Sequence, residues 1–141
     1  MKEALDNLWL VQKKYKEQLQ KLAQKQDLTI AEWELLRNIK KGAKTQKELV
    51  MTCSLDVSTL SRQLNKLLTK KMIYFQKVPG NFPNSKKKHF YSLTTKGEST
   101  ITVLDENFQV FKKQVFKHWT LEEENMLKIL LNCLVISLKR A

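Results

Sequence analysis

Apolar residues recur at helical intervals of three and four positions over most of the chain, and one short stretch has a strand-like pattern instead. From these intervals we expect helices at about residues 3–24, 30–41, 46–52, 57–70, 95–118 and 121–139. Residues 72–78 and 89–93 are rich in β-branched and aromatic side chains, and a turn-forming cluster separates them. The pattern therefore predicts a mostly α fold with one small β-hairpin.

Four Ser/Thr-x-x-Glu patterns support the predicted helix starts. In such a capping box the hydroxyl and the carboxylate each satisfy a free backbone N–H, and the carboxylate lies at the positive end of the helix dipole. The patterns begin at Thr29, Thr45, Thr95 and Thr120, and Asp56 is a further expected cap.

Two short helices within residues 45–70, followed by a hairpin, predict a winged helix-turn-helix. The hairpin must pack on the helices, because a lone hairpin is only marginally stable in water.

The helices at both ends carry more apolar surface than one small chain can easily cover. Apolar positions occupy most of the circumference of residues 121–139, and residues 101–115 have a coiled-coil-like seam. We therefore expect a helical dimerisation base, with a large internal core as the alternative. The residues expected to form this base are Leu8, Val11, Tyr15, Phe108, Phe111, Leu127, Leu130, Leu134 and Leu138.

The length of 141 residues is that of one domain, which we expect to cover residues 1–141. Within it, residues 29–96 are expected to form the winged helix-turn-helix part, and residues 1–25 and 97–141 the helical dimerisation part. No stretch has the roughly 20 apolar residues of a membrane span, and no signal peptide is visible. Because two cysteines are too few for a disulfide framework, we expect a cytoplasmic protein with reduced thiols.

The positive charge is concentrated in the middle of the chain. Residues 37–96 contain 14 basic and 2 acidic residues, which accounts for the whole net charge of +12, and the remaining 81 residues carry 12 of each sign. Such a block is the footprint expected for a polyanionic partner, and a nucleic acid is the usual one. A solvated lysine-rich surface is the alternative.

The predicted helix at 57–70 has one apolar and one cationic face. On a helical wheel the apolar arc contains Val57, Leu60, Leu64, Leu67 and Leu68. The opposite side contains Ser58, Thr59, Arg62, Lys66 and Thr69, with Ser61 near the edge of the apolar arc. An α-helix fits the major groove of B-DNA, where Arg binds guanine through two hydrogen bonds and hydroxyls reach bases or phosphates. We therefore expect a DNA recognition helix.

Two further segments are expected to join this DNA interface. Thr45 and Gln46 begin the first short helix of the helix-turn-helix, and Lys86, Lys87 and Lys88 follow the turn of the hairpin. A cationic β-loop beside a recognition helix has the shape to reach a minor groove or phosphates. The expected DNA-binding residues are thus Thr45, Gln46, Ser58, Thr59, Ser61, Arg62, Lys66, Lys86, Lys87 and Lys88.

Several stretches resemble one family of bacterial regulators. They are Leu28-Thr29 with Trp33 and Leu36, then Thr45–Leu49, then Asp56–Leu67, and finally Leu93-Thr94-Thr95-Lys96-Gly97. In this order they are similar to the MarR (multiple antibiotic resistance regulator) winged-helix family. The resemblance implies a homodimer on a pseudo-palindromic operator in double-stranded DNA, usually a repressor that a small ligand or oxidation releases. A protein-interaction module whose winged helix has lost specific DNA reading is the alternative function.

The chain departs from the family pattern at two places. Where the family's wing usually carries Asp-Arg-Arg, this chain has Ser85-Lys86-Lys87. Because Lys cannot make the two-pronged hydrogen bonds of Arg, we expect the wing to contact phosphates rather than bases. The glycine that is usual at the exit of the recognition helix is replaced by Lys71.

The remaining chemistry of the sequence is sparse. Trp9, Trp33 and Phe108 are candidates for a small-molecule effector pocket, with core packing as the alternative. Cys53 is a candidate oxidation switch, although a free Cys is more often a small buried hydrophobe. The two histidines have no partners at metal-ligand spacing, and no catalytic triad or phosphate loop is evident. We therefore expect neither an enzyme nor a cofactor or metal site.

Overall fold

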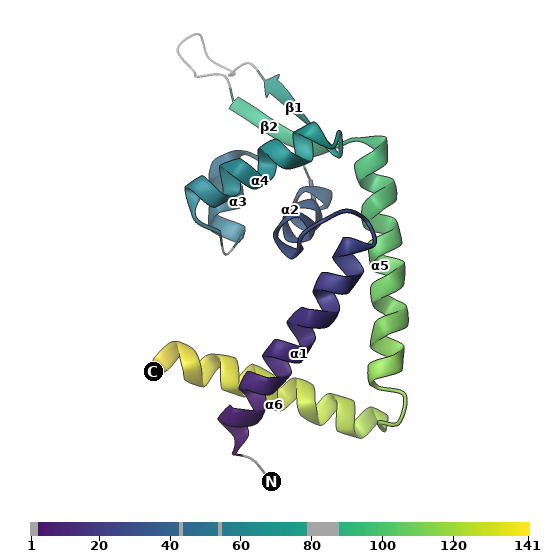
Figure 1. Ribbon diagram of the computed structural model, residues 1–141. Helices are drawn as coiled ribbons and strands as arrows, with labels where there is room; N and C mark the ends of the chain where they lie inside the picture. The colour runs from purple at the N-terminus through teal and green to yellow at the C-terminus, as the bar shows by residue number, and fades with distance from the viewer. Residues whose placement is uncertain (1–2, 43, 54, 79–87) are drawn as a thin grey trace. The chain divides into compact units, whose positions relative to one another are not determined.

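The computed structural model describes residues 3–42, 44–53, 55–78 and 88–141. The helices are α1 (Ala4–Gln24), α2 (Ile30–Lys40), α3 (Gln46–Thr52), α4 (Val57–Thr69), α5 (Thr95–Val115) and α6 (Leu121–Arg140), and the strands are β1 (Ile73–Val78) and β2 (Lys88–Leu93) (Figure 1). The mostly helical fold with one antiparallel hairpin confirms the predicted fold class. The helix-turn-helix pair is α3 and α4, and the β1–β2 hairpin follows it directly.

Local capping chemistry fixes where most helices begin. Complete capping boxes start α2, α3 and α6 at Thr29, Thr45 and Thr120, as predicted. The fourth predicted box was wrong by one residue, because the hydroxyl that caps α5 belongs to Thr94, whose Oγ1 accepts the Gly97 N–H at 3.0 Å. Thr94 is favoured over Thr95 by a second bond, in which its hydroxyl donates to the Lys71 carbonyl at 2.6 Å.

The hairpin is attached to the helices through its second strand. Ile73 pairs with Leu93 and Phe75 with Tyr91, and the rings of the second pair lie 5.1 Å apart. Lys44, in the loop between α2 and α3, exchanges two backbone hydrogen bonds with Tyr91, at 3.1 and 2.8 Å. An isolated bridge therefore joins the hairpin to the loop before α3, in line with the expectation that the hairpin packs on the helical part.

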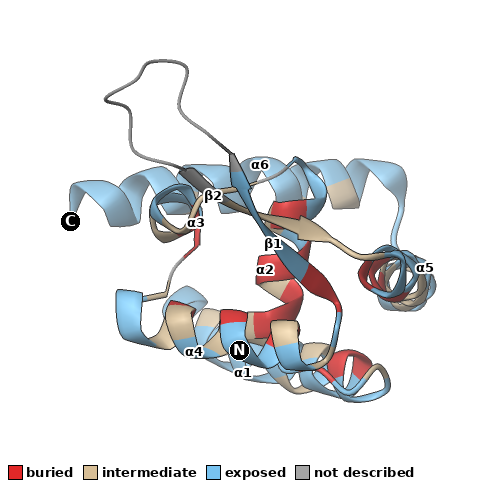
Figure 2. Cartoon of the chain, turned by 90° about the horizontal axis from the view of Figure 1, so that it is seen from above, coloured by how far each residue is buried: buried red, intermediate tan, exposed pale blue. Residues whose placement is uncertain are grey.

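The chain divides into two compact units, residues 1–106 and 107–141. The first contains the winged helix-turn-helix, and buried side chains gather there on α2, on one side of α4 and at the start of α5 (Figure 2). Leu35, Leu36, Leu60, Leu64, Leu67 and Leu104 are among its fully buried side chains. The predicted apolar arc of α4 was wrong at Val57, which is 58% exposed because it lies in the first turn, beyond the packed part of the helix.

The second unit comprises the end of α5 and the whole of α6. None of the residues of α6 is buried, and several of its apolar side chains, among them Met126, Ile129 and Ile136, are half or more exposed. Within residues 107–141, these side chains therefore form no buried core of their own. No described helix has the length and apolarity that crossing a membrane requires. The expected grouping of residues 1–25 with 97–141 stays a prediction.

Candidate nucleic-acid interface

Asp56 fixes the start of α4. Its carboxylate accepts the Thr59 N–H at 2.7 Å and the Ser58 hydroxyl at 3.0 Å. The bond from the Thr59 backbone is the main reason why the pKa of Asp56 lies below its ordinary value. Ser58 is consequently held at the helix start by an ionised cap, at the first residue of the expected outward face.

The structure separates the expected contact residues of α3 and α4 by exposure. On α4, Ser58, Arg62 and Lys66 are exposed. Thr59 and Ser61 are half-buried. At the start of α3, Thr45 and Gln46 are half-buried, and the Thr45 hydroxyl is engaged in the capping box with Glu48. The side chains most open to a partner are thus those on the outward face of α4.

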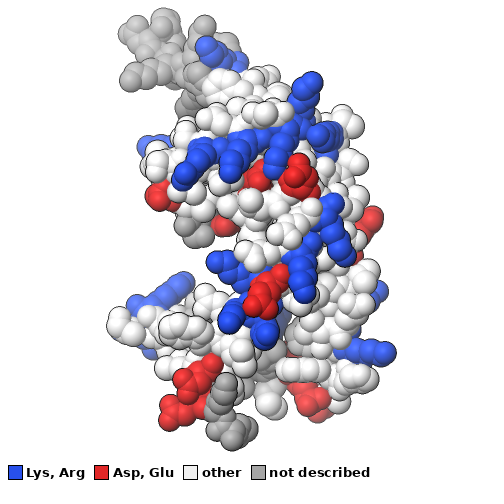
Figure 3. Space-filling model, in the orientation of Figure 1, with Lys and Arg blue, Asp and Glu red and all other residues white. Residues whose placement is uncertain are grey.

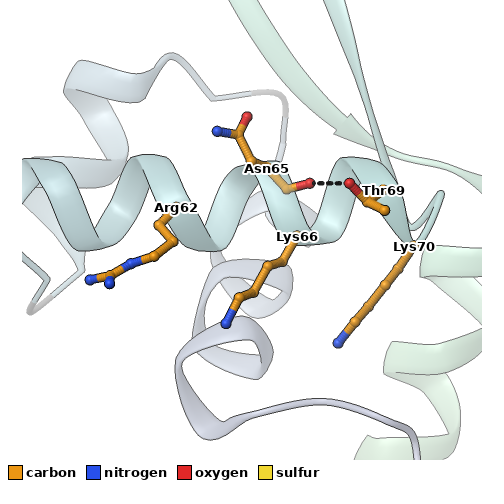
Figure 4. Close-up of a pocket in the computed structure, with 5 residues that line it drawn as sticks. All are labelled: Arg62, Asn65, Lys66, Thr69 and Lys70. Carbon is orange, nitrogen blue, oxygen red and sulfur yellow. Dashed lines mark hydrogen bonds between the residues drawn. The ribbon is translucent and has the colours of Figure 1, made fainter.

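An open hollow lies along the exposed side of α4, with a volume of about 490 Å³. It is lined by Arg62, Asn65, Lys66, Thr69 and Lys70. Figure 4 shows Arg62, Lys66 and Lys70 leaving the helix on the same side, while Asn65 leaves on another. In the space-filling view, Lys and Arg side chains form a row along α4 (Figure 3).

Asn65, Thr69 and Lys70 line the hollow but were missed as DNA-binding residues by sequence reasoning, although Thr69 was placed on the outward face. Lys70 was detectable, because it follows Lys66 by the same four residues by which Lys66 follows Arg62, and it lies directly after the last residue of α4. Asn65 had a weaker signal, since a lone amide on a polar helix face is ordinary. A row of three cations with no acid on the same helix gives the face a positive potential suited to a polyanion.

Lys70 differs from the other two cations, because its ammonium group is tied to the protein. Its Nζ donates to Glu32 Oε2 at 2.8 Å and to the Asp27 carbonyl at 2.6 Å. Glu32 is 1% exposed, and its other oxygen accepts the Thr29 N–H in the capping box of α2. The end of α4 is therefore bonded to the turn between α1 and α2.

The exit of α4 is also bonded to α5. Lys71 has a left-handed backbone with φ of 61°, which explains why a glycine is the more usual residue at this position. The Lys70 carbonyl accepts the Lys96 ammonium at 2.9 Å, and the Met72 carbonyl accepts the Thr94 N–H at 3.0 Å. A side chain at Gly97 would place its Cβ 2.0 Å from the Met72 oxygen, so α5 begins in contact with the backbone that links α4 to β1.

The tip of the wing is not covered by the structure. Lys86 and Lys87 lie outside the described residues, and Lys88 is the first residue of β2. Their expected contact with DNA stays a prediction.

The expected dimerisation residues lie on the surface of the single chain. Val11, Tyr15, Leu130 and Leu138 are exposed, and the remaining members are half-buried: Leu8, Phe108, Phe111, Leu127 and Leu134. The rings of Phe108 and Phe111 lie 6.1 Å apart on α5.

The three expected pocket residues differ in their surroundings, because Trp9 is 79% exposed, Trp33 is buried and Phe108 is half-buried. Whether they bind an effector stays a prediction.

Cys53 is buried at the end of α3. Its Sγ accepts a hydrogen bond from the Asn38 side-chain amide at 3.4 Å, and burial is the main reason why the pKa of the thiol is raised, with the charge of Glu34 adding to it. A raised pKa lowers the fraction of reactive thiolate.

Among the residues that the structure describes, no three His, Cys, Asp or Glu side chains gather as a metal site would require.

The fold and the cationic helix define a winged-helix protein, and comparison with known proteins shows what part of it resembles. Residues 26–81 match the family model described as MarR family. A MarR mutant from E. coli, solved in complex with operator DNA, is 25% identical, with a TM-score of 0.75 over 92% of this chain and 91% of that one. Residues 26–81 therefore resemble the MarR family, and the chain as a whole has the fold of the solved E. coli MarR.

Two proteins from Staphylococcus aureus share the fold at lower sequence identity. MepR, described as a transcription regulator of the multidrug efflux pump MepA, has a TM-score of 0.77 at 18% identity, over 97% of this chain and 99% of that one. A MarR solved with salicylate and kanamycin has a TM-score of 0.79 at 18% identity, over 97% of this chain and 91% of that one. Comparison with curated protein sequences gives no significant match.

Proposed function

We propose that this protein is a homodimeric regulator that binds a pseudo-palindromic operator in double-stranded DNA and represses transcription in the cytoplasm. The observation that carries the proposal is the acid-free outward face of α4, with Arg62 at its centre. Arg is the side chain that most often reads guanine in the major groove. The operator complex of the E. coli protein supports the same use of the fold.

The homodimer is supported by apolar surface that the single chain leaves uncovered. Val11, Leu130 and Leu138 are each more than half exposed, and all belong to the expected dimerisation set. Two-fold symmetry would place two copies of α4 about one helical turn of DNA apart, roughly 34–36 Å centre to centre. Light scattering should give twice the chain mass of 16.6 kDa, and a well-folded monomer would contradict this part of the proposal.

Release by a small ligand is preferred to release by oxidation. The S. aureus MarR that shares the fold was solved with salicylate, which supports a small-molecule effector. Cys53 is buried and its pKa is raised, so the thiol is poorly suited to react with an oxidant. Trp9, Trp33 and Phe108 remain the residues proposed for effector binding.

The decisive experiment is selection of bound sequences from random duplex DNA. An enriched pseudo-palindrome supports the proposal, whereas no enrichment would favour a protein-interaction module. On the enriched site, Arg62→Ala should cost about 1–3 kcal/mol and relax the preference at one or two base pairs. Equal losses on specific and random duplex would show that Arg62 contacts only phosphates.

The wing lysines provide a matched contrast to Arg62. Replacing Lys86, Lys87 and Lys88 together with Ala should weaken binding about equally on specific and random duplex. The slope of log affinity against log salt should become shallower, by about one unit for each phosphate that the variant no longer neutralises. Loss of sequence preference at an unchanged slope would show instead that the wing reads bases.

A further inference from the structure

The three cations in the row on α4 do not have equal freedom to meet DNA. Arg62 and Lys66 line the hollow from the second and third turns of the helix. Lys70 lines the same hollow, but its side chain is only 26% exposed and its Nζ already bonds Glu32 and the Asp27 carbonyl. A Lys that turned to a phosphate would leave the carboxylate of Glu32 buried without a cation, which is strongly unfavourable.

From this geometry we propose that Lys70 is a positioning residue, which sets the presentation of α4 for base reading through its ion pair with Glu32 and makes no DNA contact itself. The inference rests on the proposed DNA-binding function. The pair joins two places 38 positions apart in the sequence, the C-terminal end of α4 and the first turn of α2. Because α2 is well packed, with Leu35 and Leu36 fully buried, the carboxylate is a fixed anchor.

The other contacts of the helix ends explain why this anchor matters. The N-terminal end of α4 is capped by its own Asp56, whose carboxylate bonds residues 58 and 59 of the same helix turn. At the other end, by contrast, Lys70 bonds the turn between α1 and α2, and Lys96 of α5 bonds the Lys70 carbonyl. Hydrogen bonds from Lys70 and Lys96 therefore tie this end of the recognition helix to the rest of the winged helix.

The test compares Lys70→Met with Lys66→Met, a matched control one turn earlier on the same helix. Both variants remove one charge and keep an unbranched side chain. Binding to the selected duplex and to random duplex is measured by fluorescence anisotropy over a salt series, at a temperature well below unfolding. Thermal unfolding of each variant is followed by circular dichroism. Sequence-specific binding by the wild type tests the proposed function separately, before any variant is compared.

Lys66→Met should make the salt slope shallower by about 0.9 for each phosphate that it no longer neutralises, with the unfolding temperature unchanged. Lys70→Met should keep the wild-type slope of log affinity against log salt and lower the unfolding temperature. It should reduce the ratio of the affinity for the selected duplex to the affinity for random duplex about tenfold. Lys70→Arg, which preserves the ion pair, should restore most of that ratio. A merely structural role would lower the unfolding temperature without changing the ratio.

A second variant keeps the proposal testable if Lys70→Met does not fold. In the double variant Glu32→Gln with Lys70→Met no buried charge is left alone, and the amide oxygen can still accept the Thr29 N–H. This double variant should unfold at a higher temperature than Lys70→Met alone and still discriminate poorly between the two duplexes. The proposal is overturned if it discriminates as well as the wild type, or if Lys70→Met shows the shallower slope of Lys66→Met.

Discussion

Gly97 is a position at which the structure leaves no room for a side chain. It is buried in the first turn of α5, and an added Cβ would lie 2.0 Å from the carbonyl oxygen and 3.0 Å from the carbonyl carbon of Met72. The oxygen would have to retreat by about 1 Å to reach the 3.0 Å below which such contacts essentially never occur. The same oxygen accepts the Thr94 N–H, so the shift would also break this bond.

These contacts set the expected cost of Gly97→Ala. Overpacking against backbone costs about 3 kcal/mol, and the broken hydrogen bond about 1 kcal/mol. The better helix propensity of Ala returns about 1 kcal/mol. The net loss of about 3 kcal/mol should lower the unfolding temperature by roughly 10 °C in a chain of this size.

The assay is thermal and urea unfolding followed by circular dichroism, with Ser99→Ala as control. Ser99 is exposed on the same helix two residues later, so its replacement should be neutral or slightly stabilising. If Gly97→Ala unfolded at or above the wild-type temperature, the close approach of α5 to the α4–β1 connection would be refuted.

Two further predictions follow from the backbone and the thiols. Lys71→Gly should stabilise the protein by about 0.5–1 kcal/mol in urea unfolding, because glycine avoids the strain of φ 61° but loses more chain entropy; a loss of stability would contradict the left-handed conformation. At neutral pH, iodoacetamide should spare the buried Cys53 until the protein unfolds, as peptide mass spectrometry would detect. Rapid labelling of Cys53 at neutral pH would refute its burial. Because the pKa of the Cys53 thiol is raised in the folded state, the contribution of the thiol to folding stability is complete below the pKa of the unfolded thiol. This contribution is lost as the pH rises through the folded pKa.

Most element boundaries could be predicted from the sequence, because they are set by local interactions. The capping boxes at Thr29, Thr45 and Thr120 each involve residues three positions apart, and periodicity is visible within one helix. The error at the start of α5 had a non-local cause. The local signal favours Thr95, because Glu98 lies three residues after it, but the bond from Thr94 to the distant Lys71 carbonyl makes Thr94 the cap.

The centre of the candidate interface was predictable for the same reason, but the different bonding of Lys70 at its edge was not. The cationic face around Arg62 and Lys66 follows from the spacing along one helix. Nothing in that spacing distinguishes Lys70 from Lys66, although Lys70 alone of the two is bonded to the buried carboxylate of Glu32. The partner of Lys70 is 38 positions away, and its own sequence signal, a Glu in a capping box, is fully explained without Lys70.

The apolar surface of the terminal helices is where the local pattern of the sequence and the single chain disagree most. An apolar circumference predicts burial, yet Ile129 and Leu130 of α6 and Trp9 of α1 are each more than half exposed. Burying a large aliphatic side chain is worth about 1.5–3 kcal/mol, so several such residues in water are a substantial cost. A two-fold dimer removes this cost most simply, because each copy presents to the other the same surface that it needs to cover. On that proposal, the residues that the single chain leaves exposed are explained by the same dimer symmetry that spaces two recognition helices along DNA.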